Sequence, residues 1–240
     1  MKVINDLVGY NNLKIVQDTE WFSFSLDSVL LPNFVTILPA CKKILDLGTG
    51  NAPIPMILQT KTDAEIYSIE IQKEIYDLAK ESLEINKLES RIKLINDDMK
   101  NLDKYFESDS FDLIITNPPY FKVNEESRKN KTEQKSIARH EIHIKLEEIL
   151  QISKKYLKNG GTFAMVNRTE RLIEIIEVFR KNNIEPKKIR LVYPKIDAES
   201  NMILIEGRKN AKSGIKFLPP LFVHNNNGDY TEEVLKYFSD

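Results

Sequence analysis

The sequence predicts an α/β fold: a doubly wound, mostly parallel sheet with an antiparallel edge hairpin near the C-terminus. Two observations predict it. From residue 43 onward, buried-strand patterns alternate with helical patterns, and polar or glycine-rich turns follow the strands. The last two strand patterns, residues 188–193 and 201–206, are joined by a short connection, so we expect them to pair antiparallel.

Composition and charge are those of an ordinary globular protein. The chain has 240 residues, 41% of them hydrophobic and 30% charged, with a formal net charge of -1. Such a chain does not by itself indicate a nucleic-acid partner, so any basic surface must be local. The single Cys41 excludes an internal disulfide, and neither a signal segment nor a membrane-length apolar run is evident. We expect a cytoplasmic protein with no membrane partner; the oligomeric state stays open, with a monomer favoured.

The chain is expected to form one domain over residues 1–240. Its parts are an N-terminal cap (1–40), a catalytic core (41–208) and a C-terminal extension (209–240). Within the cap, residues 13–16 form a short apolar strand pattern, and a helix pattern begins at Ser25 or Asp27 and runs to about Ile37.

A glycine-rich turn after the first core strand predicts a cofactor loop. Residues 43–53 combine a buried strand, Gly48 and Gly50, and a proline suited to the first turn of a helix. Dinucleotide sites use G-x-G-x-x-G, whereas here Asp46 stands two residues before the first glycine. An acid there suits a cationic group, such as the amino group of a methionine moiety. Taken alone, a two-glycine turn is also compatible with a plain connection.

The second strand pattern, residues 64–69, ends at Glu70. This acid lies 20 residues beyond Gly50, the separation expected of a carboxylate that binds ribose hydroxyls. Ile71 could then lie against an adenine ring. A helix pattern follows over residues 72–87.

The third strand pattern, residues 91–96, delivers Asp97 and Asp98 to the same edge of the sheet. One carboxylate could accept a hydrogen bond from an adenine amino group, and helix capping is the competing role. We predict Asp98 as the ligand, with Met99 beside it. Paired acids also suggest magnesium, but no third carboxylate or nearby histidine converges on them, so we expect no metal.

The fourth strand pattern, residues 111–116, leads into Asn117-Pro118-Pro119-Tyr120. The two prolines stiffen this loop and withhold two backbone donors. It therefore offers the Asn117 side-chain carbonyl, the Pro118 backbone carbonyl and the Tyr120 ring, which suit a planar amine conjugated to a ring. We predict these four residues as catalytic, with Asn117 also contacting the cofactor. A turn that merely closes the strand is the competing interpretation.

The C-terminal half continues the alternation. Residues 144–157 form an amphipathic helix pattern that stops at the Asn-Gly-Gly of residues 159–161, a typical helix end. A strand pattern (162–166) and a helix pattern (169–182) follow, and after the hairpin we expect an extended tail with a final helix over residues 230–238.

Two basic clusters are candidate RNA contacts. Residues 121–139 carry six basic side chains and three glutamates and lack apolar periodicity, which predicts a mobile loop beside the active site. The second cluster combines residues 187–195, which no acid interrupts, with Arg168 and Arg171. A merely solvated loop is the competing interpretation of the first cluster. The predicted RNA contacts are Lys122, Arg128, Lys129, Lys131, Arg139, Arg168 and Lys195.

Across roughly residues 10–208 the chain resembles the Rossmann-like class I methyltransferases that use S-adenosylmethionine. The Asn117 loop is similar to the motif of enzymes that methylate planar nitrogens. Three further stretches resemble the bacterial tRNA valine adenine N6-methyltransferase family: F-S-F-x-x-D-x-x-L-L at residues 22–31, A-R-H-E at 138–141, and residues 193–206. This resemblance implies S-adenosylmethionine as cofactor, a tRNA anticodon arm as partner, and methylation of adenosine 37 next to the anticodon. Ala52 replaces the third glycine common in the cofactor loop.

Three alternatives stay open on the sequence. A protein glutamine N5-methyltransferase of release factors carries the same four-residue loop, but such enzymes have a larger helical N-terminal domain, for which residues 1–40 leave no room. An rRNA or DNA adenine N6-methyltransferase is the second alternative. A non-catalytic RNA-binding module on the same fold is the third, although Asp46, Glu70 and the Asn117 loop are all intact.

Overall fold

The computed structural model describes residues 1–7, 10–18, 25–118 and 144–238. The strands of its main sheet are β3 (Lys43–Leu47), β4 (Glu65–Glu70), β5 (Ile92–Asn96), β6 (Phe111–Thr116), β7 (Leu157–Asn167), β8 (Ile184–Tyr193), β9 (Met202–Lys209), β10 (Lys216–Phe217) and β11 (Leu221–Phe222). The helices are α1 (Leu26–Phe34), α2 (Pro53–Leu58), α3 (Lys73–Asn86), α5 (Leu146–Tyr156), α6 (Leu172–Lys181) and α7 (Glu232–Lys236), with short 3-10 helices η1 (Met99–Lys104) and η3 (Thr169–Arg171).

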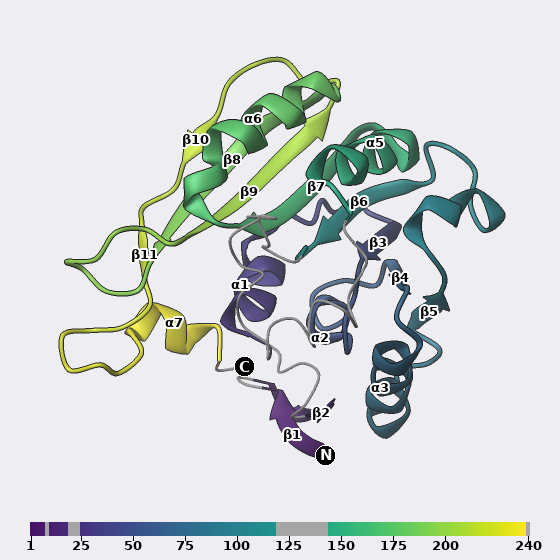
Figure 1. Ribbon diagram of the computed structural model, residues 1–240, viewed down its shortest axis with the longest axis horizontal. Helices are drawn as coiled ribbons and strands as arrows, with labels where there is room; N and C mark the ends of the chain where they lie inside the picture. The colour runs from purple at the N-terminus through teal and green to yellow at the C-terminus, as the bar shows by residue number, and fades with distance from the viewer. Residues whose placement is uncertain (8–9, 19–24, 119–143, 239–240) are drawn as a thin grey trace, which may run out of the picture.

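The described strands form one large sheet in the order β10-β8-β9-β7-β6-β3-β4-β5, with β11 also pairing β8 (Figure 1). Strands β5, β4, β3, β6 and β7 run parallel, and β9 runs antiparallel to both β7 and β8. The predicted fold class is confirmed, including the antiparallel β8–β9 pair. Two short strands, β10 and β11, add parallel pairing on the outer side of β8.

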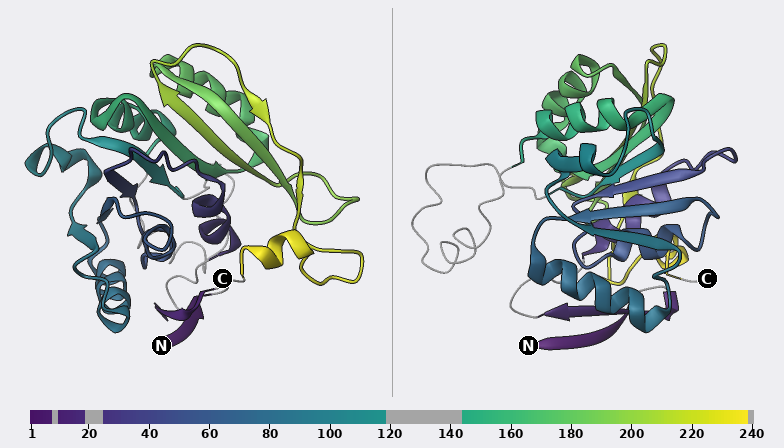
Figure 2. Two further views of the ribbon diagram at one scale, coloured as in Figure 1. Left: turned by 180° about the vertical axis from the view of Figure 1, so that it is seen from behind. Right: turned by 90° about the vertical axis from the view of Figure 1, so that its right-hand side faces the viewer.

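Helices cover both faces of the sheet, as the side view in Figure 2 shows. Successive side chains of a strand point to opposite faces, so Ile44 of β3 packs into one core and its neighbour Leu45 into the other. Buried side chains of α1, α2 and α3 fill the first core, and those of α5 and α6 fill the second. Apolar residues on both faces explain why the central strands have nearly continuous hydrophobic sequences.

The N-terminal cap contains a strand that the sequence did not indicate. β1 (Lys2–Leu7) pairs antiparallel with β2 (Tyr10–Asp18), and the hairpin lies against α3 (Figure 1). Four of the six residues of β1 are exposed, so it lacks the apolar alternation by which strands are recognised. α1 starts after Ser25, as predicted, but ends at Phe34 rather than near Ile37.

The predicted helix end at residues 159–161 is wrong. α5 ends at Tyr156, and Leu157 already pairs with Phe111 of β6. Because Thr162 pairs with Leu113, the Asn-Gly-Gly stretch forms a bulge inside β7 rather than a helix cap. Gly160 supplies the left-handed backbone of this bulge, with φ of +73°.

The C-terminal extension packs on β8 instead of trailing as an extended tail. The Arg190 guanidinium of β8 donates to the Pro219 carbonyl at 3.0 Å and to the Tyr237 hydroxyl at 2.9 Å, and it forms an ion pair with Glu233 of α7. Val234 of α7 is fully buried. The extension is therefore part of the packed structure.

Candidate active site

The carboxyl ends of β3, β4 and β6 meet at the centre of the sheet. Leu47, which ends β3, pairs with Ile69 on one side and with Thr116 on the other, and the buried Thr116 hydroxyl donates to the Leu47 carbonyl at 2.8 Å. The strand order reverses between β3 and β6, which is where open α/β sheets bind ligands. The structure thus brings together the predicted cofactor loop, Glu70 and Asn117.

The glycine-rich loop turns sharply at Gly48 and Gly50. Their φ angles of +70° and +62° lie in the left-handed region, which glycine enters without a Cβ penalty. The N–H groups of Gly48 and Thr49 donate to the Ile69 carbonyl at 3.0 and 3.1 Å, so the loop is fastened to β4. Ala52 is also left-handed, with φ of +72°, at a cost on the order of 1 kcal/mol for an alanine.

Glu70 provides a second connection between the loop and β4. One carboxylate oxygen accepts from the Gly50 N–H and the other from the Gln72 N–H, both at 3.0 Å, and the side chain is buried. Burial raises the pKa of Glu70, and these backbone hydrogen bonds offset part of the rise. Each oxygen has a second lone pair, so the carboxylate can still accept from a ribose hydroxyl.

Asp46 is fully buried, and among the described residues neither of its carboxylate oxygens has a hydrogen-bond partner. The Thr49 and Ser68 hydroxyls are buried and equally unpartnered there, and Ser68 stands opposite Asp46 in the sheet. Burial, and to a lesser degree the Glu70 carboxylate, raises the pKa of Asp46 to about 7. The nearby Thr49 hydroxyl favours the charged carboxylate and so lowers this pKa somewhat, although the two side chains are not hydrogen-bonded. Orphaned buried polar atoms are rare because each costs free energy, so Asp46 suits a partner from outside the chain.

Asp97 and Asp98 differ in what they contact. Asp97 accepts from the Asn101 amide, the Lys104 ammonium and the Tyr105 hydroxyl, and these bonds hold its pKa well below the usual range. Asp98 caps η1, because one oxygen accepts from the Lys100 N–H at 2.9 Å. Asp98 thus takes the helix-capping role that was the competing interpretation of its position, and its role as a cofactor ligand stays a prediction.

Met99 and Ile71 border the same loop. A Cβ atom placed on Gly48 would lie 3.9 Å from the Met99 Cε, so the methionine faces the glycine turn. Ile71 follows Glu70 and is half-buried. The Asn96 amide donates to the Glu70 carbonyl at 2.8 Å and to the Ile71 carbonyl at 3.3 Å, which holds this turn in place.

Asn117 and Pro118 follow β6 directly. The Asn117 side-chain Nδ2 donates to the Ser28 hydroxyl of α1 at 3.2 Å, so its carbonyl oxygen is the atom of the amide turned away from Ser28. Pro118 is buried. The predicted catalytic residues Pro119 and Tyr120 lie outside the described residues.

Three residues that support the site were not predicted from the sequence: Ser28, Asn51 and Asn96. Asn51 stands inside the glycine-rich loop and Asn96 at a strand end, so their positions alone were a signal. Ser28 carried no comparable signal, because its partner Asn117 is 89 residues away in the chain.

The second basic cluster is not one surface. Lys188 forms an ion pair with Glu206 at 2.9 Å, Arg190 is buried against the C-terminal extension, and Arg171 pairs with Glu174 at 2.6 Å. These cations are already held by internal partners.

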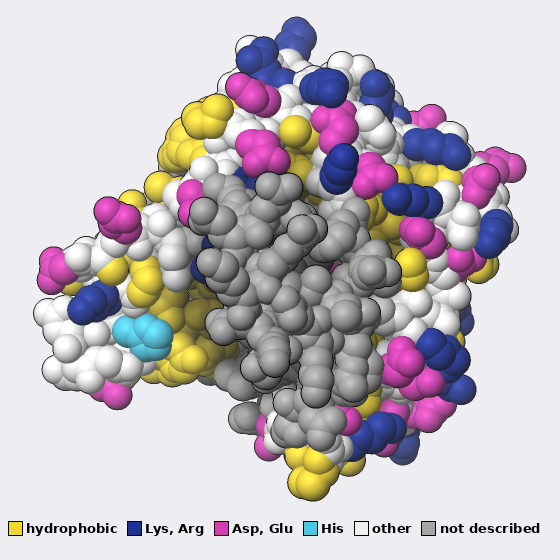
Figure 3. Space-filling view, viewed as in Figure 1, with side chains coloured by type: hydrophobic (Ala, Val, Ile, Leu, Met, Phe, Trp, Pro, Cys, Tyr) yellow, Lys and Arg dark blue, Asp and Glu magenta, His cyan; other side chains and the backbone are white. Residues whose placement is uncertain are grey.

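Arg168 and Lys195 are exposed, and they lie at the carboxyl ends of β7 and β8, on the same edge of the sheet as Asn117. Their two loops are joined by the Thr169 and Ser200 hydroxyls at 2.8 Å. The other predicted RNA contacts, which are Lys122, Arg128, Lys129, Lys131 and Arg139, lie outside the described residues. On the described part of the face in Figure 3, Lys and Arg side chains are interspersed with Asp and Glu side chains.

The described ranges contain no candidate metal cluster and no candidate membrane-spanning helix. No group of three or more His, Cys, Asp or Glu side chains in residues 1–7, 10–18, 25–118 and 144–238 could hold a metal ion. Nor does any helix in this part of the chain have the length and apolarity needed to cross a membrane.

Comparison with known proteins decides the family. A methyltransferase domain model matches residues 40–212. The tRNA1(Val) (adenine(37)-N6)-methyltransferase of Parabacteroides distasonis is 30% identical over 182 residues, which cover 75% of this chain and 74% of the relative. The chain belongs to this family. The Flavobacterium johnsoniae member is 26% identical over 229 residues and 94% of both chains, so the match to the tRNA1(Val) (adenine(37)-N6)-methyltransferase family extends beyond the core.

Solved structures agree on the fold. A predicted O-methyltransferase from Agrobacterium tumefaciens superposes with a TM-score of 0.71 at 22% identity, covering 88% of this chain and 95% of that protein. M. jannaschii TYW2, solved in complex with AdoMet, gives a TM-score of 0.57 at 16% identity over 86% of this chain and 84% of that one. The tRNA1(Val) (adenine(37)-N6)-methyltransferase family member described here therefore has a class I methyltransferase fold.

Proposed function

We propose that this protein transfers a methyl group from S-adenosylmethionine to the N6 amino group of adenosine 37 in a tRNA. The observation that carries the proposal is the position of Asn117. The Asn117 amide lies at the end of β6, next to the glycine-rich loop that follows β3. The chain belongs to a methyltransferase family, so this position suits a residue that contacts the methyl acceptor. A methyl donor and a planar amine could therefore meet at one edge of the sheet.

The residues present fit the cofactor. S-adenosylmethionine carries a cationic amino group, and the orphaned carboxylate of Asp46 is a buried acceptor that such a cation would satisfy. Glu70 at the end of β4 would accept from the ribose hydroxyls, Ile71 and Met99 would contact the adenine ring, and Asp98 would accept from its amino group. When bound, the cofactor supplies an electrophilic methyl group on its sulfonium.

The protein's part in the reaction is to position the amine and stabilise charge. The adenine N6 lone pair is delocalised into the ring, so attack becomes easier when the Asn117 and Pro118 carbonyls accept the two amino hydrogens. As the nitrogen attacks, positive charge develops on it, and both carbonyl dipoles stabilise that charge. After transfer, the methylated amine is acidic enough to lose its proton to water, so no side chain need act as a base. From sequence, Tyr120 is the residue proposed to stack on the base.

The target base must leave its stack to enter the site, which favours a loop over an intact duplex. The anticodon loop satisfies this requirement. Arg168 and Lys195 could bind its phosphates, because both are exposed on the edge that carries Asn117.

The test uses purified protein, methyl-labelled S-adenosylmethionine and unmodified tRNA1(Val) transcript. Nucleoside mass spectrometry should find N6-methyladenosine, and a matched transcript with guanosine at position 37 should remain unlabelled. Parallel reactions with rRNA, DNA and release factor test the alternative targets. Labelling of the guanosine-37 transcript, or preferential labelling of one of those three substrates, would overturn the proposed target.

A further inference from the structure

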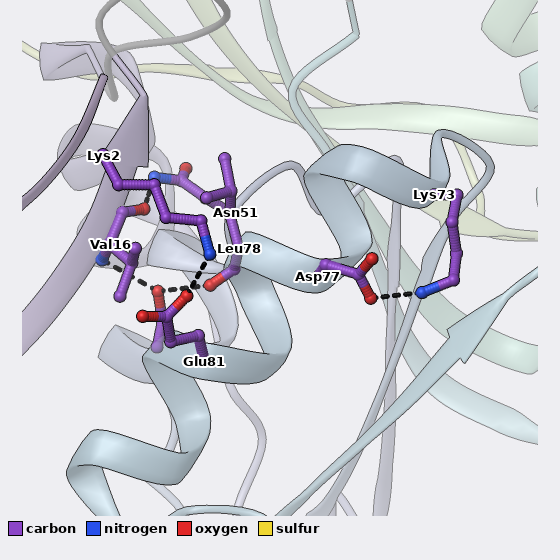
Figure 4. Close-up of polar contacts among 8 residues, drawn as sticks. Lys2, Val16, Asn51, Lys73, Asp77, Leu78 and Glu81 are labelled. Atoms are coloured by element: carbon purple, nitrogen blue, oxygen red, sulfur yellow. Dashed lines mark hydrogen bonds and ion pairs between the residues drawn. The ribbon is translucent and has the colours of Figure 1, made fainter.

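The Asn51 side chain ties the cofactor loop to the N-terminal hairpin. Asn51 lies inside the loop, is 1% exposed, and donates through Nδ2 to the Val16 carbonyl of β2 at 2.9 Å (Figure 4). The Val16 N–H in turn donates to the Ser82 hydroxyl of α3, also at 2.9 Å. The backbone carbonyl of Val16 is therefore bound by the cofactor loop, and its backbone N–H is bound by α3.

Asn117, which follows β6, is tied to the same N-terminal region. Ser28 of α1 is 4% exposed, and its hydroxyl accepts from the Asn117 amide at 3.2 Å. An asparagine amide has two nearly isosteric ends, and only the carbonyl end can accept from an amine. Here the Ser28 hydroxyl accepts from the Nδ2 end, so this contact holds the amide with its carbonyl end turned away from Ser28.

β2 and α1 are joined directly. The Asn33 amide of α1 donates to the Tyr10 hydroxyl of β2 at 3.3 Å and to the Val29 carbonyl at 2.8 Å. Leu13 and Ile15 of β2 belong to the same apolar core as Leu30 of α1. β2 and α1 thus share a hydrogen bond and an apolar core, and between them they contact Asn51 and Asn117.

We propose that Asn51 and Ser28 are positioning residues through which β2 and α1 hold the cofactor loop and the Asn117 amide in place for methyl transfer. The inference rests on the proposed function for the role of Asn117. The bond from Thr116 to Leu47 already fixes the spacing of the two strand ends. That bond neither orients the Asn117 amide nor holds the cofactor loop at Asn51. The contacts from Ser28 and Val16 supply these two restraints.

Asn51 is tested by calorimetry with S-adenosylmethionine alone. Asn51→Ala should raise the cofactor dissociation constant about fivefold to tenfold, the effect of losing one buried hydrogen bond that orders a binding loop. Ser82→Ala is the matched control, because it removes the other hydrogen bond of Val16 without touching the loop, and it should change cofactor affinity less than twofold. Equal effects from both variants, or none from Asn51→Ala, would overturn the role of Asn51.

Ser28 is tested by its dependence on Asn117. Ser28→Ala should lower the turnover number about fivefold to tenfold at saturating cofactor and leave the cofactor dissociation constant unchanged, whereas Ser28→Thr, which keeps the hydroxyl, should recover most of the rate. In an Asn117→Ala background, Ser28→Ala should have no further effect, because a residue that acts through Asn117 has nothing left to orient. A full additional loss in that background would show a merely structural role.

Methyl labelling by the wild-type protein tests the proposed function, whereas the Asn51 and Ser28 variants test their roles in positioning. Should the wild type label another of the tested substrates, the turnover comparison is made on that substrate. The calorimetric comparison needs no methyl acceptor, so it stands whatever the target proves to be.

Discussion

One carboxylate oxygen of Glu70 accepts a hydrogen bond from the Gly50 N–H at 3.0 Å, so the acid that we propose for the ribose also shapes the cofactor loop. Glu70→Ala should therefore weaken S-adenosylmethionine binding about tenfold or more, since a charged hydrogen-bond partner is lost. Isothermal titration calorimetry measures the effect. Glu65→Ala, at the exposed opposite end of the same strand, is the control and should bind normally. Unchanged affinity of Glu70→Ala would contradict the cofactor placement.

Asp46 makes the stability of the cofactor-free protein depend on pH. Its pKa rises from 3.8 to about 7 on folding, chiefly through burial. Between these two values the folded protein keeps a proton that the unfolded chain has released, so the free energy of unfolding should fall as pH rises from about 4 to 7. Above pH 7 the loss should be on the order of a few kcal/mol. Urea unfolding at pH 5, 6, 7 and 8 measures it, and Asp46→Asn should flatten the curve relative to wild type. Parallel curves for the two proteins would count against a buried, raised Asp46.

Asn117→Ala removes one acceptor from the reacting amine. If the amide acts on charge that develops during transfer, turnover should fall by roughly two orders of magnitude, the scale for one preorganised electrostatic partner. The tRNA dissociation constant should change little, because the interaction of the amide with the amine strengthens only in the transition state. Single-turnover assays together with binding measurements check both parts. Wild-type rates in this variant would remove Asn117 from the catalytic centre.

Arg168 and Lys195 should contribute to tRNA binding through phosphates. Replacing both with alanine should raise the tRNA dissociation constant and reduce its salt slope by roughly one per lost contact. Filter binding from low to moderate salt measures this. The matched control replaces the exposed Lys61 and Lys212, which follow α2 and β9 at the opposite edge of the sheet. An equal change in both double variants would indicate a general charge effect.

Gly161 should tolerate no side chain in the β7 bulge. A Cβ there would lie 2.9 Å from the Lys158 carbonyl oxygen and 3.2 Å from the Asp112 carbonyl oxygen, which are backbone atoms with little freedom to move. Gly161→Ala should cost about 1–3 kcal/mol of unfolding free energy, as overpacking usually does. Denaturant unfolding measures it, and Asn159→Ala, at an exposed neighbour, should fall within about 0.5 kcal/mol of wild type. A neutral Gly161→Ala would mean that the bulge relaxes readily.

Most central elements could be predicted from sequence because their signals are local. The strand expected at residues 111–116 is β6 over those same residues, and the helix expected at 72–87 differs from α3 by one residue at each end. Burial on one face of a helix or on both faces of a central strand imposes a periodicity that a short window reveals. β1 lacked that pattern. The Asn-Gly-Gly of β7 was misleading, because strand pairing with β6 outweighed the local preference of these residues for a helix end.

The sequence by itself determined the chemistry available at the site: two glycines and an acid after one strand, Glu70 after the next, and Asn117-Pro118 after β6. Strand ends in a parallel sheet share one edge, so these groups were expected to meet. Only the tertiary structure decided how they are held, through Ser28 on Asn117 and Val16 on Asn51, and which cations stay exposed, since Lys188 is paired internally while Lys195 is not buried. Such partners lie far apart in the chain and are selected by packing, which leaves no local pattern to recognise.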